Sequence, residues 1–75
     1  MPKIPSLTAR QIIRALHRAG FIEDRQKGGH LVMLNVSTKT RTIIPIHSGK
    51  TIKKSLVHAI MNDAKLTTEK FLELL

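Results

Sequence analysis

The sequence predicts one α+β domain in which the elements follow the order α-β-β-β-α and a short helix comes last. Apolar residues recur at helical spacing before Gly20 and again after Lys50. Between these stretches the apolar period falls to two, and short turn segments separate three runs that are typical of strands. Helices before and after a three-stranded antiparallel sheet are expected to pack together on one face of the sheet and to leave its other face in water.

The first helix is expected to begin after Thr8. Thr8 and Gln11 have the spacing of a capping box, and Leu7 and Ile12 have the spacing of a hydrophobic staple. Gly20 ends the helix, because glycine readily adopts the left-handed backbone found at helix C-termini. Within this helix, three arginines at four-residue steps lie on the face opposite the apolar residues: Arg10, Arg14 and Arg18. Their repulsion costs roughly a few tenths of a kcal/mol per pair unless an anion arrives, and a merely solvated face is the alternative interpretation.

Three strands are expected at residues 21–26, 30–36 and 40–46. Residues 27–29 form a tight hairpin turn between the first two strands, with glycine supplying positive φ angles. Residues 37–39 form the second turn. Pro45 cannot donate a ladder hydrogen bond, so the third strand ends there or lies at a sheet edge.

The second half of the chain is expected to be helical after a loop at residues 47–50. Apolar residues from Ile52 to Met61 predict an amphipathic helix whose start stays open between Thr51 and Ser55. Thr67 caps the last short helix, and Leu66 is placed to close over Phe71.

The charge is unevenly distributed along the chain. Thirteen Lys and Arg stand against five Asp and Glu, which gives a net charge of +8. Residues 1–54 contain eleven of these bases and two of the acids. A basic surface of this kind attracts a polyanion, and nucleic acid is favoured over an acidic protein or a membrane surface. Phe21 and Phe71 are the only aromatic residues, so recognition of RNA by backbone and shape is favoured over base stacking.

The chain contains no cysteine, which excludes disulfides and thiolate metal sites and fits a cytoplasmic location. No apolar run approaches the length needed to cross a bilayer, and the first residues lack the apolar centre of a secretory signal. One domain over residues 1–75, with no membrane association, is therefore expected.

Histidine is the residue type through which this sequence can carry out chemistry. His17 and His58 lie beside the apolar stripes of their helices and are expected to be ordinary surface residues, whereas His30 and His47 lie at strand ends or loops. No pair of histidines has metal-ligand spacing and no nucleophile motif is present, so neither a metal site nor a cofactor is expected. RNA carries its own nucleophile, the 2′-hydroxyl, so proton transfer by an imidazole beside a held phosphate is sufficient for cleavage.

The turn sequence Gly28-Gly29-His30 is the strongest candidate for such a site, because a donor-rich glycine turn beside a histidine can cradle a phosphate. Arg25 and Lys27 alternate along one strand, so they share one face and are candidates for contacting the RNA backbone. Their alternative role is a solvated hairpin edge.

Two further candidates lie in the expected loop after the third strand. His47 has three possible roles, as a second acid, as a phosphate ligand or as a residue that closes the loop, and Lys50 adds positive charge to the same region.

Four segments in order resemble the HicA toxin family, also called YcfA-like proteins: Gly-Phe at 20–21, Arg-Gln-Lys-Gly-Gly-His at 25–30, Ile-Pro-Ile-His-Ser-Gly-Lys at 44–50 and Leu-Thr-Thr-Glu-Lys-Phe at 66–71. The resemblance implies a fold similar to the double-stranded RNA-binding domain and the activity of an mRNA interferase in a toxin–antitoxin module. It also implies that a HicB-type antitoxin silences the protein and that His30 is the catalytic histidine. Gly29 departs from the family, which usually has serine there, and residues 53–56 are about one residue shorter than the family segment.

The leading hypothesis is therefore a metal-independent endoribonuclease in which His30 transfers the proton and cations hold the RNA backbone. An RNA-binding module without catalysis, or an adaptor regulated by a partner, is the alternative. A third class is an interaction subunit whose basic face docks an acidic protein.

Overall fold

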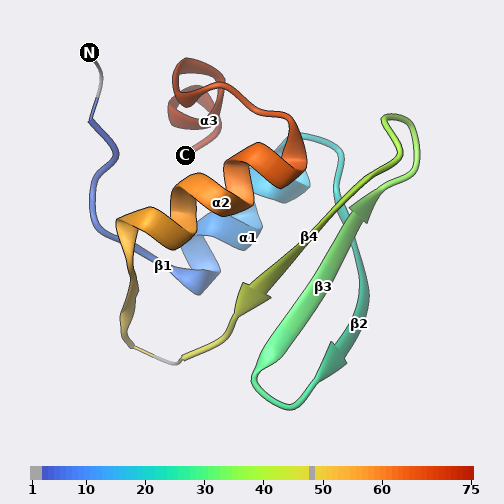
Figure 1. The fold of residues 1–75 in the computed structure, drawn as a ribbon, viewed down its shortest axis with the longest axis horizontal. Coiled ribbons are helices and arrows are strands. Elements are labelled where there is room, and N and C mark those ends of the chain that lie inside the picture. Colours follow the sequence, from blue (N-terminus) through green and yellow to red (C-terminus); the bar gives the residue numbers. More distant parts are fainter. Residues whose placement is uncertain (1–2, 48) are drawn as a thin grey trace.

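The computed structural model describes residues 3–47 and 49–75, and it confirms the predicted α+β fold. Figure 1 shows the two longer helices lying together on one side of the strands. The elements in chain order are β1 (Leu7–Thr8), α1 (Ala9–Arg18), β2 (Ile22–Lys27), β3 (His30–Asn35), β4 (Thr40–Pro45), β5 (Thr51–Ile52), α2 (Lys54–Ala64) and α3 (Thr68–Leu74). Ser48, which belongs to the predicted loop, lies outside the described residues.

Both predicted ends of α1 are confirmed. The Thr8 hydroxyl accepts a hydrogen bond from the Gln11 backbone N–H at 3.3 Å, and the Thr8 N–H donates to Gln11 Oε1 at 2.8 Å, which completes the capping box. At the other end Gly20 has φ +101°, and the Phe21 N–H donates to the Leu16 carbonyl at 2.9 Å. This bond turns the chain back and directs Phe21 into the core.

Strands β2, β3 and β4 form the predicted antiparallel meander, in which β3 is central. Strand β4 is an edge strand and ends at Pro45, and an edge position tolerates the missing N–H of this residue. The strand ends differ from the prediction by one residue. The register between β2 and β3 shifts between Glu23 and Arg25, so Asp24 lies in a bulge.

A second, two-stranded sheet was not predicted. Leu7 of β1 pairs with Ile52 of β5, and both side chains are buried. This pairing holds the segment before α1 against the segment before α2. Helix α2 then begins at Lys54, and its N-cap residue, Lys53, makes no side-chain capping bond, so the sequence carried no signal for this start.

The two final helices are joined by a tight reversal. Lys65 has φ +61° and the Leu66 N–H donates to the Met61 carbonyl at 3.0 Å, so α2 ends like a glycine-terminated helix although the residue is lysine. The Thr67 hydroxyl accepts from the Lys70 N–H at 3.1 Å, which confirms the predicted cap of α3.

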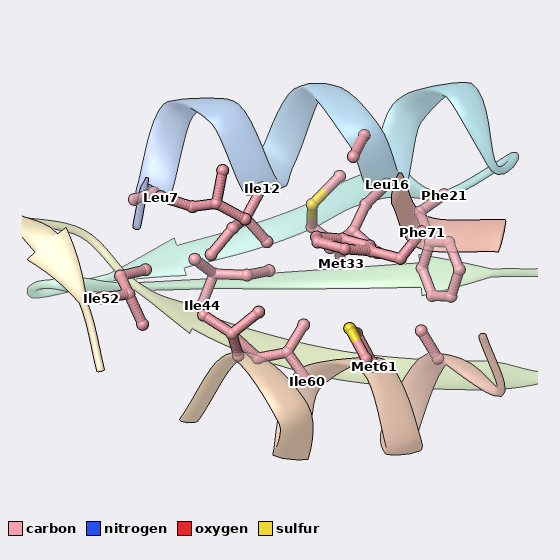
Figure 2. Packing of buried hydrophobic residues seen from close by; sticks show 14 of the residues in the cluster. Leu7, Ile12, Leu16, Phe21, Met33, Ile44, Ile52, Ile60, Met61 and Phe71 are labelled. Atoms are coloured by element: carbon pink, nitrogen blue, oxygen red, sulfur yellow. The ribbon is translucent and has the colours of Figure 1, made fainter. Parts of the chain in front are cut away.

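The core lies between the two longer helices and the face of the sheet that they cover, as Figure 2 shows. Each of its large side chains contributes about 1.5–3 kcal/mol through burial. The largest fully buried apolar side chains are Phe21, Phe71, Ile12, Leu16, Met33, Ile44, Ile60 and Val57. No helix among the described residues is both long and apolar enough to cross a bilayer.

Candidate functional site

We call the side of the three-stranded sheet that faces away from the helices the outer face. Residues that are paired across an antiparallel ladder point to the same side, and residues along a strand alternate. The register of the three strands therefore defines the outer face as Ile22, Arg25, Lys27, His30, Val32, Leu34, Arg41, Ile43 and Pro45.

His30 is the first residue of the central strand and is exposed on the outer face. It pairs with Lys27 on one side and with Pro45 on the other. Side chains that are paired in this way have Cβ atoms about 4.5–5.5 Å apart, so the Lys27 ammonium can reach a group that is bound at the imidazole. Arg25 lies two residues before Lys27 on the same face. The structure thus brings together three of the residues that the sequence singled out.

The hairpin turn that precedes His30 consists of Gly28 and Gly29. Gly28 has φ +60°, whereas the φ of Gly29 lies outside the left-handed region, which is the pattern of a type II′ turn. Glycine therefore supplies a positive φ at only one of the two predicted positions. The Gly29 carbonyl accepts a hydrogen bond from the Ile46 N–H at 2.6 Å, and this bond ties the turn to the chain that leaves β4.

Arg25 has an acidic neighbour in the bulge. Its Nε lies 3.4 Å from Asp24 Oδ2, and the Arg25 side chain is 68% exposed. An exposed pair of this kind contributes about 0–1 kcal/mol, so a phosphate can take the place of the carboxylate at little cost.

His47 and Lys50 lie beyond the end of β4, in the loop that leads to β5, and the Lys50 N–H donates to the His47 carbonyl at 3.1 Å. Figure 1 shows this loop running from β4 toward the start of α1. A hollow of about 410 Å³ lies there, and His47 contributes to its wall. The lining residues are Thr8, Ala9, Arg10, Ile46, His47 and Gly49. The structure therefore places His47 beside this hollow, which we call the α1 hollow.

The arginines of α1 are all exposed but have different surroundings. Arg10 lines the α1 hollow, whereas Arg14 lines a separate hollow formed with the segment before α1. Arg18 Nη1 donates to the Leu74 carbonyl at 2.7 Å and so binds the end of α3. Local sequence does not distinguish Arg10 from the other two arginines, because the loop that lines the same hollow comes from a distant part of the chain.

Acidic residues are absent from the sequence between Arg25 and Asp63, which includes β3, β4, the loop and β5. Strands β3 and β4 and the loop after them therefore contribute only neutral or positive side chains, whereas the acids Glu23 and Asp24 lie on β2 beside Arg25. Within residues 3–47 and 49–75, no three His, Asp or Glu side chains lie close enough together to hold a metal ion.

A family model described as the HicA toxin of bacterial toxin-antitoxin matches residues 9–66. The chain belongs to the HicA toxin family. The match begins at the first residue of α1 and ends two residues after α2, so this HicA protein matches its family over the whole outer face and the α1 hollow except Thr8. No curated protein matches the sequence.

Proposed function

We propose that this HicA protein is an endoribonuclease that cleaves messenger RNA in the cytoplasm without a metal ion, and that His30 is its catalytic residue. The observation that carries the proposal is the exposure of His30 on the outer face directly opposite Lys27, with Arg25 on the same face. An imidazole beside cations on an open surface has the two components that RNA transphosphorylation requires, a proton acceptor and a positive charge near the phosphate.

In the proposed step, His30 removes the proton of a ribose 2′-hydroxyl, and the resulting oxygen attacks the adjacent phosphorus. A bond forms between the 2′-oxygen and phosphorus while the bond from phosphorus to the 5′-oxygen breaks. The products are a 2′,3′-cyclic phosphate and a 5′-hydroxyl, which receives one proton from the protonated imidazole or from water. Lys27 and Arg25 stabilise the negative charge that develops on the phosphate oxygens.

The remaining candidates support the same substrate. Gly28 and Gly29 allow the RNA backbone to approach the turn without a side chain in the way, and the turn N–H groups are available to a phosphate. His47 and Lys50 hold the RNA backbone beyond the edge of the sheet.

The decisive experiment is cleavage of a mixed-sequence RNA by the purified protein with EDTA present. His30→Ala is expected to abolish cleavage, because the proton acceptor is lost, and to leave the melting temperature and RNA affinity nearly unchanged. His58→Ala is the matched control, since His58 is an exposed histidine on α2, a helix on the opposite side of the sheet. Equal cleavage by His30→Ala and the wild type would refute the assignment.

The same assay separates the enzyme from a non-catalytic RNA-binding module. A binding module retains RNA with a steep dependence on salt but yields no new fragments. Fragments that end in a cyclic phosphate and disappear in His30→Ala support the enzyme.

The outer face also supports the proposal of a protein partner, because it exposes apolar side chains that a phosphate backbone does not use. Ile22 is 54% exposed and Ile43 is 48% exposed. Ile22 pairs with Leu34 and Ile43 pairs with Val32, which places both isoleucines on the same face as His30. The partner that fits such a face combines apolar contacts with acidic groups that complement the net charge of +8. We therefore propose that an acidic HicB-type antitoxin covers this face and blocks His30.

The double change Ile22→Ser and Ile43→Ser tests this partner. The expected result is a loss of affinity for the antitoxin encoded beside this chain of about tenfold or more, because two large apolar contacts are lost. RNA cleavage is expected to persist. Val36→Ser is the control, because Val36 is 70% exposed but follows β3. Unchanged antitoxin affinity in the double variant would contradict the proposed surface.

A further inference from the structure

The α1 hollow lies next to the proposed site, and the chain that connects the two is continuous. Pro45 pairs with His30, and the next residue, Ile46, donates its N–H to Gly29 and lines the hollow. His47 follows directly. An extended protein chain spans at most about 3.6 Å per residue, and His47 is only two residues from Pro45. The α1 hollow therefore begins a few nucleotides of RNA backbone away from the imidazole of His30.

The two ionisable residues of the hollow are a cation and a histidine. Arg10 and His47 come from different elements, α1 and the loop after β4, and both line the hollow. Among the described residues, neither has a carboxylate within ion-pair distance. The guanidinium of Arg10 therefore stands beside a concave surface with its charge uncompensated, and an anion that enters the hollow has a planar, multivalent donor to bind.

We propose that the α1 hollow binds a second phosphate of the RNA, held by Arg10 and His47 and separated by a few nucleotides from the phosphate that is cleaved at His30. This inference rests on the proposed function, because it assigns a further part of the same substrate. The RNA then runs along the end of the sheet, from the turn at residues 28–29 across Ile46 to the start of α1. Arg10 and His47 bind and position the RNA and take no part in the proton transfer.

The proposed RNA path predicts that substitutions of two arginines in α1 have different effects on RNA affinity. Arg10 faces the RNA, whereas Arg14, one turn later, lines a hollow with Pro5, Ser6 and Leu7 and lies off the path. The changes Arg10→Gln and Arg14→Gln remove the same charge from the same helix, so the net charge of the protein falls equally in both.

The test measures the affinity of RNA in the His30→Ala background, in which no substrate is consumed. The probes are a mixed-sequence RNA hairpin and a dinucleotide that fills only the scissile site. For the hairpin, Arg10→Gln is expected to lower affinity about tenfold and to reduce the slope of log K against log salt by about one unit, the effect of one lost phosphate contact. His47→Gln is expected to lower it less. Arg14→Gln is expected to change affinity by about twofold or less, and the dinucleotide is expected to distinguish none of these variants.

Equal losses in Arg10→Gln and Arg14→Gln would overturn the inference, because the effect would then be one of net charge alone. An unchanged affinity for RNA together with a weaker affinity for the antitoxin would also overturn it and would assign the hollow to the protein partner. Cleavage is measured separately in the chain that retains His30. A wild type that binds RNA and does not cleave it refutes the proposed ribonuclease, while the comparison of the two arginines still decides whether the hollow binds RNA. Thermal melts of each variant establish that the fold is retained.

Discussion

The hairpin turn beside His30 allows one substitution to be compared at two adjacent positions, with opposite expected effects. Gly28 has φ +60°, which an L-residue adopts only with strain. Gly29 has no positive φ, and a Cβ built there would meet the Ile46 carbonyl oxygen at 3.8 Å, an ordinary van der Waals distance. The two substitutions to compare are therefore Gly28→Ser and Gly29→Ser, and the second introduces the serine that the HicA family usually has.

The expected changes in the free energy of unfolding follow from the backbone angles. No atom lies within 4 Å of a Cβ at position 28, so the cost of Gly28→Ser is conformational alone, about 1–2 kcal/mol. Gly29→Ser is unstrained and restricts the unfolded chain, so it is expected to stabilise by about 0.4–1 kcal/mol. For a domain of this size, each kcal/mol shifts the melting temperature by about 4–8 °C. The two variants are therefore expected to melt on opposite sides of the wild type.

Thermal unfolding followed by circular dichroism measures these shifts, and RNA cleavage measures the consequence for the site. Gly29→Ser is expected to raise cleavage about fivefold, because a hydroxyl beside His30 adds one hydrogen bond to the bound phosphate. Equal melting temperatures for the two variants would refute the assignment of the positive φ to Gly28 alone. A fall in cleavage by Gly29→Ser would refute the proposed role of the turn in holding the phosphate.

Two further predictions concern the framework that carries the site. Lys65→Gly is expected to stabilise the protein by about 1 kcal/mol, because the lysine now adopts a left-handed φ of +61° at the end of α2, and urea unfolding measures the gain. Asn35→Ala is expected to destabilise it by about 2 kcal/mol in the same assay. The Asn35 side chain donates to the Ala19 carbonyl at 3.3 Å and accepts from the N–H groups of Ser37 at 3.0 Å and Thr38 at 3.3 Å, and all three bonds are lost. A loss of less than about 0.5 kcal/mol would mean that water replaces them.

The features that could be predicted from the sequence are those decided by residues a few positions apart. The caps formed by Thr8 and Thr67 and the stop at Gly20 depend on bonds within one helical turn, and all three are confirmed. Strands β1 and β5 have two residues each and carry no periodicity of their own. They form because Leu7 and Ile52 meet in the core, and that contact depends on the tertiary fold.

The candidate site likewise has some features that local sequence predicts and others that depend on the tertiary fold. Arg25 and Lys27 share a face because strand residues alternate, and their pairing with β3 places His30 beside them. The bulge at Asp24 was not predicted, and it determines that Ile22 lies on the outer face together with Arg25. That Arg10 and His47 line one hollow could not be predicted from local sequence, because it depends on where the loop after β4 lies relative to α1.

The proposed RNA path and the proposed antitoxin surface share the outer face but extend from it in different directions. RNA continues from His30 toward Arg10, whereas the antitoxin uses the apolar residues represented by Ile22 and Ile43. In these proposals both ligands cover His30, so their binding is expected to be mutually exclusive. The apparent affinity of the antitoxin is then expected to fall in proportion as RNA rises above its dissociation constant. Arg10→Gln weakens the competing RNA and so raises the apparent affinity of the antitoxin, although the change lies outside the apolar patch. The balance between free and silenced toxin is then expected to depend on two groups of side chains that the proposal assigns to binding and not to proton transfer.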